Sequence, residues 1–146
     1  MAKVVKLATC AVGGSSMDAA EAAMLKIEWR CPTIFEEDRM VSEEELQVVG
    51  HWNDRKAQKA QHTAEIVGRF HTIQDAKQHF EMFHVASRAR HNDPETRDLQ
   101  WATQAIGGEA EELLEALQTE DPVVRRDRVI DEAGDLLYCS WLAEWI

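Results

Sequence analysis

The most informative stretch of this chain is residues 105–138, AIGGEAEELLEALQTEDPVVRRDRVIDEAGDLLY, which contains two acidic pairs. Glu109 pairs with Glu112, and Glu132 pairs with Asp135. Residues three apart lie on one face of a helix, so each pair presents its two carboxylates together. Like charges side by side on an otherwise apolar helix indicate a cation between them. Carboxylates gathered in this way suit Mg²⁺, an ion that commonly accompanies phosphate chemistry.

The spacing between the pairs predicts two antiparallel helices. We expect the first over residues 105–117 and the second over residues 123–145, joined by a short link. Asp121 suits an N-cap and Pro122 suits the first helical position. So short a link makes the two helices antiparallel neighbours. With a rise of about 1.5 Å per residue, all the paired carboxylates then fall within about two turns of one another.

An alternative interpretation of the acidic pairs is a solvated helix face. Glu is a good helix former, and a single ExxE pair is usually no more than surface charge. Two pairs in compatible register on one hairpin favour a shared site instead. The pairs also border apolar stripes with helical spacing, formed by Ile106, Leu113, Leu114, Leu117, Ile130, Ala133, Leu136 and Leu137.

The run from Gly108 to Glu115, followed by the run from Asp131 to Tyr138, resembles the MazG-like all-α nucleoside triphosphate pyrophosphohydrolases. That superfamily also includes dCTP pyrophosphatases, dimeric dUTPases and phosphoribosyl-ATP pyrophosphohydrolase. Its signature is ExxE, a spacer of variable length, and then ExxD. The resemblance is specific over about 99–143, and no similarity is visible before about residue 70.

The resemblance implies Mg²⁺-dependent cleavage between the α- and β-phosphates of a nucleoside triphosphate, which yields a monophosphate and pyrophosphate. It makes Glu109, Glu112, Glu132 and Asp135 the metal ligands, with Mn²⁺ as a substitute metal. Metal ions in such a site neutralise the triphosphate and lower the pKa of a bound water. A carboxylate can then orient or deprotonate that water. We assign this catalytic role to Glu112, with Glu109 as the alternative.

Substrate binding also requires cations for the phosphates and flat apolar groups for the base. Many relatives have Lys, Arg or Asn residues for the substrate beyond the ExxD helix, and here we expect such cations from upstream residues or a second subunit. Arg97 is our candidate for the phosphates, although an ordinary surface arginine is the alternative. Trp101 and His84 are candidates to stack on the base, and Tyr138 is expected to border the site.

Composition excludes several classes of function. The 27 acidic and 16 basic residues give a net charge of −11, which argues against binding nucleic-acid polymers but not against nucleotides bridged by metal. The 146 residues, of which 45% are apolar, suit a single domain. The 3 cysteines are odd in number and lack zinc spacing, which favours thiols in a reducing compartment. No apolar run is long enough to span a membrane, so we predict a cytoplasmic protein.

Capping signals elsewhere predict an all-α helical bundle with antiparallel ExxE and ExxD helices. We treat 1–70 as an N-terminal extension of uncertain role and 71–146 as the MazG-like catalytic helices. Residues 3–7 favour a short strand or extended segment. Other expected features are a helix from Ser15 to before Cys31, a loop over 32–41, a helix starting at Ser42, and a helix starting at Thr72 with Phe80 and Phe83 in the core.

Two hypotheses of different classes follow. The favoured one is a nucleotide pyrophosphohydrolase that acts in nucleotide-pool housekeeping as a homodimer or homotetramer. Its rival is a non-catalytic acidic helical protein that binds a basic partner. The sequence contains no HExxH zinc motif and no P-loop, which argues against zinc hydrolysis and P-loop chemistry as sources of the activity.

Overall fold

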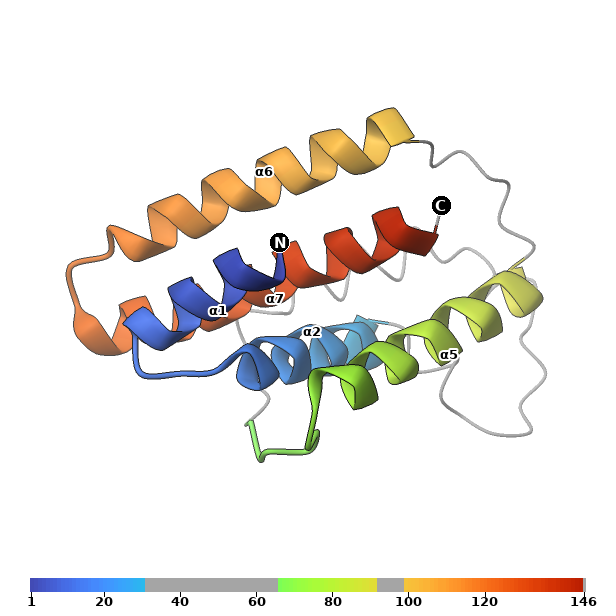
Figure 1. Ribbon diagram of the computed structural model, residues 1–146, viewed down its shortest axis with the longest axis horizontal. Coiled ribbons are helices and arrows are strands. Elements are labelled where there is room, and N and C mark those ends of the chain that lie inside the picture. Colours follow the sequence, from blue (N-terminus) through green and yellow to red (C-terminus); the bar gives the residue numbers. More distant parts are fainter. Residues whose placement is uncertain (31–65, 92–98, 146) are drawn as a thin grey trace.

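The computed structural model describes residues 1–30, 66–91 and 99–145, with side chains described over 1–28, 66–82 and 99–144. Within these ranges every regular element is a helix, which confirms the all-α prediction (Figure 1). The bounds are α1 Ala2–Ala11, α2 Ser16–Arg30, α5 Ile73–His91, α6 Leu99–Leu117 and α7 Pro122–Trp145. None of these helices is long and apolar enough to cross a lipid bilayer.

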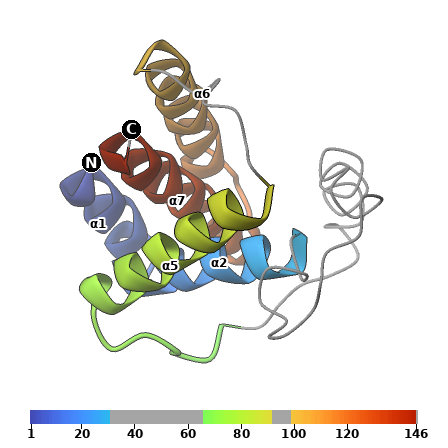
Figure 2. The same cartoon turned by 90° about the vertical axis from the view of Figure 1, so that its right-hand side faces the viewer.

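Helix α7 is the centre of the bundle. It contacts α1, α2 and α6, and α5 packs mainly on α2. Figures 1 and 2 both show α7 between α6 and α2. All these helices contribute to one hydrophobic core, whose buried members include Val5, Met24, Phe80, Leu113 and Leu136. Residues before position 31 therefore share their core with the C-terminal hairpin.

The segment 3–7 is helical and lies inside α1, so the expectation of a short strand is wrong. Val5, Ala8 and Thr9 are buried, and this spacing of three and four places them on one helical face. Five residues are too few to separate a strand pattern from a helical one, and packing of that face on α2 and α7 favours the helix. The helix ends at Ala11, and Gly13 follows two residues later with a φ of 77°, a left-handed conformation that suits glycine.

Reciprocal capping boxes begin two of the helices. Ser15 N donates to the Asp18 carboxylate at 2.9 Å, and Asp18 N donates to Ser15 Oγ at 3.2 Å. Thr72 and Asp75 make the same pair of hydrogen bonds before α5, both at 3.1 Å. Both satisfy amide groups that the first turn of a helix leaves without partners. The predicted starts of these two helices are confirmed, whereas the features expected over 32–42 lie outside the described residues.

The hairpin of α6 and α7 forms as predicted. Asp121 Oδ1 accepts hydrogen bonds from Val123 N at 2.9 Å and Val124 N at 3.0 Å, which is the expected N-cap. The Arg125 guanidinium also donates to the backbone carbonyls of Thr119 and Glu120, and this closes the turn. The turn thereby determines which residues of the two helices face each other.

One face of α6 differs from the prediction. Leu113 and Ala116 are buried, and Ile106 and Leu117 are partly buried against the core. Leu114 was expected on the same stripe, but 60% of it is exposed. The reason is geometric, because among the described helices α6 packs chiefly on α7, and a helix that packs mainly on one neighbour buries only a narrow stripe.

Helices α2 and α7 approach each other unusually closely at Gly134. A Cβ atom on Gly134 would lie 2.5 Å from the carbonyl oxygen of Ala19 and 3.3 Å from the amide nitrogen of Ala23. Only a residue without a side chain permits this contact. The approach brings the following turn of α2 within reach of the acidic residues on α7.

The chain enters α5 through a backbone segment held by a buried carboxylate. Glu21 on α2 is 1% exposed and accepts hydrogen bonds from the amides of Val67, Gly68 and Arg69 at 3.0 to 3.2 Å. Gly68 has a φ of 73°, which lets consecutive amides converge on one anion. Nothing in the sequence pattern indicated this role for Glu21.

Candidate metal centre

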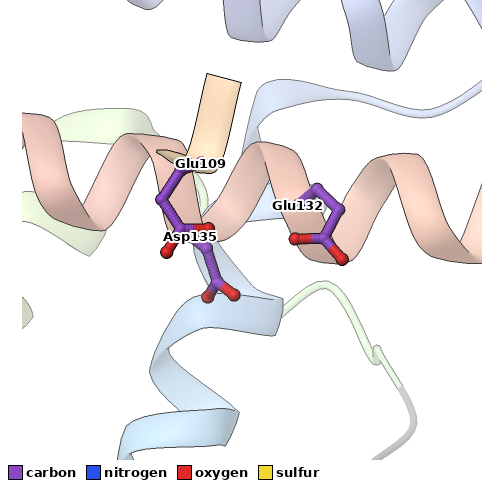
Figure 3. Close-up of side chains that lie close together, drawn as sticks. All are labelled: Glu109, Glu132 and Asp135. Carbon is purple, nitrogen blue, oxygen red and sulfur yellow. The ribbon is translucent and has the colours of Figure 1, made fainter. Parts of the chain in front are cut away.

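Three carboxylates from α6 and α7 come together in the structure. One oxygen from each of Glu109, Glu132 and Asp135 lies within 4.8 Å of the others, and all these side chains are half-buried. Figure 3 shows Glu132 and Asp135 projecting from α7 while Glu109 approaches from α6. In the described part of the chain this is the one group of potential ligands with such spacing. Hard oxygen ligands in this number suit Mg²⁺ or Mn²⁺.

The packing of the hairpin explains why these residues meet. Glu132 and Asp135 are three apart on α7 and flank Ala133, which is buried in the core. Glu109 lies one turn before Leu113, whose buried side chain faces α7. Apolar contacts between the helices therefore position the carboxylates along the edge of the same interface.

The structure does not include Glu112 in this group. Its side chain is exposed on α6, one turn beyond Glu109. Glu112 is still near enough for its charge to contribute to the raised pKa of Glu132. The role of Glu112 as a metal ligand or as the group that activates water stays a prediction.

Glu132 is the most perturbed carboxylate of the site. Burial raises its pKa to about 7, and the charges of Asp135, Asp131 and Glu112 act in the same direction, against the effect of Lys26. Its Oε2 atom is shielded from solvent and has no hydrogen-bond partner among the described residues. A buried acceptor surrounded by like charges is costly, and a divalent cation would satisfy it. The residues present therefore fit a hard metal ion.

A lysine that the sequence analysis missed lies on the other side of Asp135. The Lys26 ammonium on α2 is 2.6 Å from both carboxylate oxygens of Asp135 and 2.9 Å from Asp131 Oδ1. Its side chain is 7% exposed. Burial alone would lower the pKa of Lys26, but the charges and hydrogen bonds of Asp135 and Asp131 outweigh burial and raise it. The Lys26 ammonium therefore places a positive charge beside the acidic group.

Part of this arrangement has a signal in the sequence. Asp131 precedes Asp135 by four positions, so a helical α7 places both on one face, and this could have been inferred. Lys26 has no such signal, because 109 residues separate it from Asp135. Its role depends on the packing of α2 against α7.

The predicted substrate residues have different outcomes. Tyr138 is half-buried and packs edge-to-face on Phe80, with ring centroids 5.2 Å apart. Phe80 is a core residue as predicted, 1% exposed. Trp101 on α6 is 37% exposed, which leaves its ring accessible. The side chains of His84 and Arg97 lie outside the described residues, and so does that of Phe83, so their roles stay predictions.

Comparison of the chain with protein-family models, curated proteins and solved structures gives no significant match. The resemblance to the MazG-like proteins rests on the residues of the ExxE and ExxD helices.

Proposed function

We propose that this chain is a Mg²⁺-dependent nucleoside triphosphate pyrophosphohydrolase of the MazG-like type. In this proposal it cleaves a nucleoside or deoxynucleoside triphosphate to the monophosphate and pyrophosphate. The observation that carries the proposal is the convergence of Glu109, Glu132 and Asp135 on an antiparallel hairpin that bears the ExxE and ExxD pairs. Each of the three carboxylates offers an oxygen within 4.8 Å of the others, and this spacing allows them to bind one ion together.

The proposed roles follow from position and burial. Glu109, Glu132 and Asp135 would hold the cation, which when bound neutralises the triphosphate and assists attack at phosphorus. We assign to Glu112, which is exposed one turn beyond Glu109, the proposed role of orienting or deprotonating the attacking water. Trp101 is proposed to stack on the base, with Tyr138 bordering the site and His84 and Arg97 as the further substrate contacts.

The net charge of −11 is consistent with this chemistry when a cation bridges the protein and the polyphosphate. We also propose a homodimer or homotetramer that works in the cytoplasm. Exposed apolar residues on α6 support self-association, namely Leu99, Trp101 and Leu114.

The proposal is tested by incubating the purified protein with a panel of nucleoside triphosphates and Mg²⁺ and analysing the products. We expect a monophosphate and pyrophosphate from at least one of them, and release of orthophosphate alone would contradict the bond assignment. Removal of Mg²⁺ by a chelator should abolish turnover.

Matched variants separate the site from the general acidity of the chain. Glu109→Gln and Glu132→Gln should each lower kcat/KM by about 100-fold or more, as expected for loss of a metal ligand. Glu111→Gln and Glu115→Gln change exposed residues of the same helix and should retain activity. Equal losses in both sets, or no turnover with any triphosphate, would favour the rival function, an acidic helical protein that binds a basic partner.

A further inference from the structure

Asp135 is shared between two sides of the acidic site. Toward α6 it offers an oxygen to the group formed with Glu109 and Glu132. Toward α2 both its oxygens receive the Lys26 ammonium at 2.6 Å, and the same ammonium reaches Asp131 at 2.9 Å. Each carboxylate oxygen has two lone pairs, so Asp135 can accept from Lys26 and still bind a metal ion.

The position of Lys26 is determined by the packing of α2 on α7. Ala19, Ala23 and Lys26 follow one another at spacings of four and three, so they share one face of α2. The first two lie against Gly134, within 2.5 Å and 3.3 Å of a Cβ placed there. The Lys26 side chain is 7% exposed, and withdrawing the ammonium would require burial without partners or separation of the helices.

The ammonium contacts the carboxylate oxygens that a second metal ion would need as ligands. Carboxylate sites with two divalent ions hold them about 3.5 to 4 Å apart and use shared carboxylates between them. Asp135 has the position of such a shared ligand, with Asp131 as a further ligand on the α2 side. A second ion there would compete with Lys26 for the same oxygens and meet its positive charge at close range.

We propose that Lys26 is a built-in cation in place of a second divalent ion, so that the site takes a single ion on Glu109, Glu132 and Asp135. This inference rests on the proposed function and assigns Lys26 as a positioning residue for Asp135. The single positive charge on Lys26 also balances Asp131, which lies outside the three-carboxylate group.

The test is the number of Mn²⁺ ions bound per chain, measured by calorimetry and by electron paramagnetic resonance on the full-length protein. The wild type should bind a single tight ion with the spectrum of an isolated Mn²⁺. Lys26→Met removes the ammonium but keeps an unbranched chain, and it should admit a second ion that is spin-coupled to the first. Lys26→Arg retains the charge and should remain at a single ion.

Lys77→Met is the matched control, because it also breaks a lysine–carboxylate pair, with Glu144, away from the site. It should leave the number of bound ions unchanged. A Lys26→Met chain that folds and still binds a single ion overturns the inference. If that variant does not fold, the wild-type protein is titrated with Mn²⁺ up to millimolar concentration instead. The spectrum of a single isolated ion then supports the inference, and the spectrum of a coupled pair of ions overturns it.

These outcomes distinguish the two proposals. A coupled pair in the wild type, together with pyrophosphate release, overturns the single-ion assignment and leaves the hydrolase proposal standing. A wild type that binds no Mn²⁺ overturns both. A single bound ion without turnover of any triphosphate supports the assignment of Lys26 and contradicts the proposed reaction.

Discussion

Substitution of Gly134 by alanine is expected to destabilise the protein, although alanine is the better helix former. Gly134 lies in the middle of α7, where a Cβ would be 2.5 Å from the carbonyl oxygen of Ala19. Ordinary van der Waals contact begins near 3.4 Å. The difference of 3.4 − 2.5 = 0.9 Å must come from separating α2 and α7, because the atom in contact belongs to the backbone.

The magnitude follows from two opposing effects. Overpacking of this kind costs about 3 kcal/mol in the free energy of unfolding. The higher helix propensity of alanine offsets about 1 kcal/mol of it. We therefore expect a net loss of about 2 kcal/mol, which for a chain of this size corresponds to a fall in Tm of about 4 to 8 °C.

Two other helical glycines provide matched controls for Gly134→Ala. A Cβ on Gly107 or on Gly108 in α6 would meet no atom within 4 Å. Gly107→Ala and Gly108→Ala should therefore each stabilise the protein by about 0.5 to 1 kcal/mol. Urea titration followed by circular dichroism measures all three. A Gly134→Ala variant as stable as these controls would refute the close approach of α2 to α7.

The remaining predictions concern single polar groups. In the absence of divalent metal near pH 8, Glu132→Gln should raise the free energy of unfolding by about 1 kcal/mol, after allowance for solvent screening. The native pKa of Glu132 is about 7, above the ordinary value of 4.5, so the wild-type side chain becomes neutral as the pH falls. The gain should therefore shrink toward pH 5, which urea titrations measure. The pKa of Glu28 is changed in the opposite direction: burial opposes ionisation, but Arg69 and His79 outweigh it and lower the pKa. The ionised Glu28 side chain should therefore stabilise the fold fully at pH values above its ordinary pKa, and this stabilisation should be lost as the pH falls through its lower pKa in the folded protein. Acid titrations of Glu28→Gln and the wild type measure this difference. Asp121→Ala should cost about 1 kcal/mol by removing two N-cap hydrogen bonds, measured by thermal unfolding. Glu21→Ala should increase hydrogen exchange at the amides of residues 67–69, and unchanged exchange there would contradict the anchoring role of Glu21.

Local signals were sufficient for much of the helical framework. The capping boxes at Ser15 and Thr72 act within four residues, so their hydrogen bonds are encoded where they occur. The same holds for the N-cap at Asp121 and for the short turn between α6 and α7. Because that turn sets the register of the hairpin, the sequence was also enough to bring Glu109 near Glu132 and Asp135.

Contacts between distant segments decided the rest. Residues 3–7 are helical because α2 and α7 bury one face of α1, and no pattern of five residues contains that information. Lys26 enters the acidic site across a separation of 109 residues, and only where Gly134 lets α2 approach. The sequence by itself indicated that Glu109, Glu132 and Asp135 share the hairpin, whereas the tertiary structure left Glu112 exposed outside this group and decided the charge balance of the site. The physical reason is that hydrogen bonds within a turn depend on neighbouring residues, while desolvation and ion pairing depend on which helices pack together.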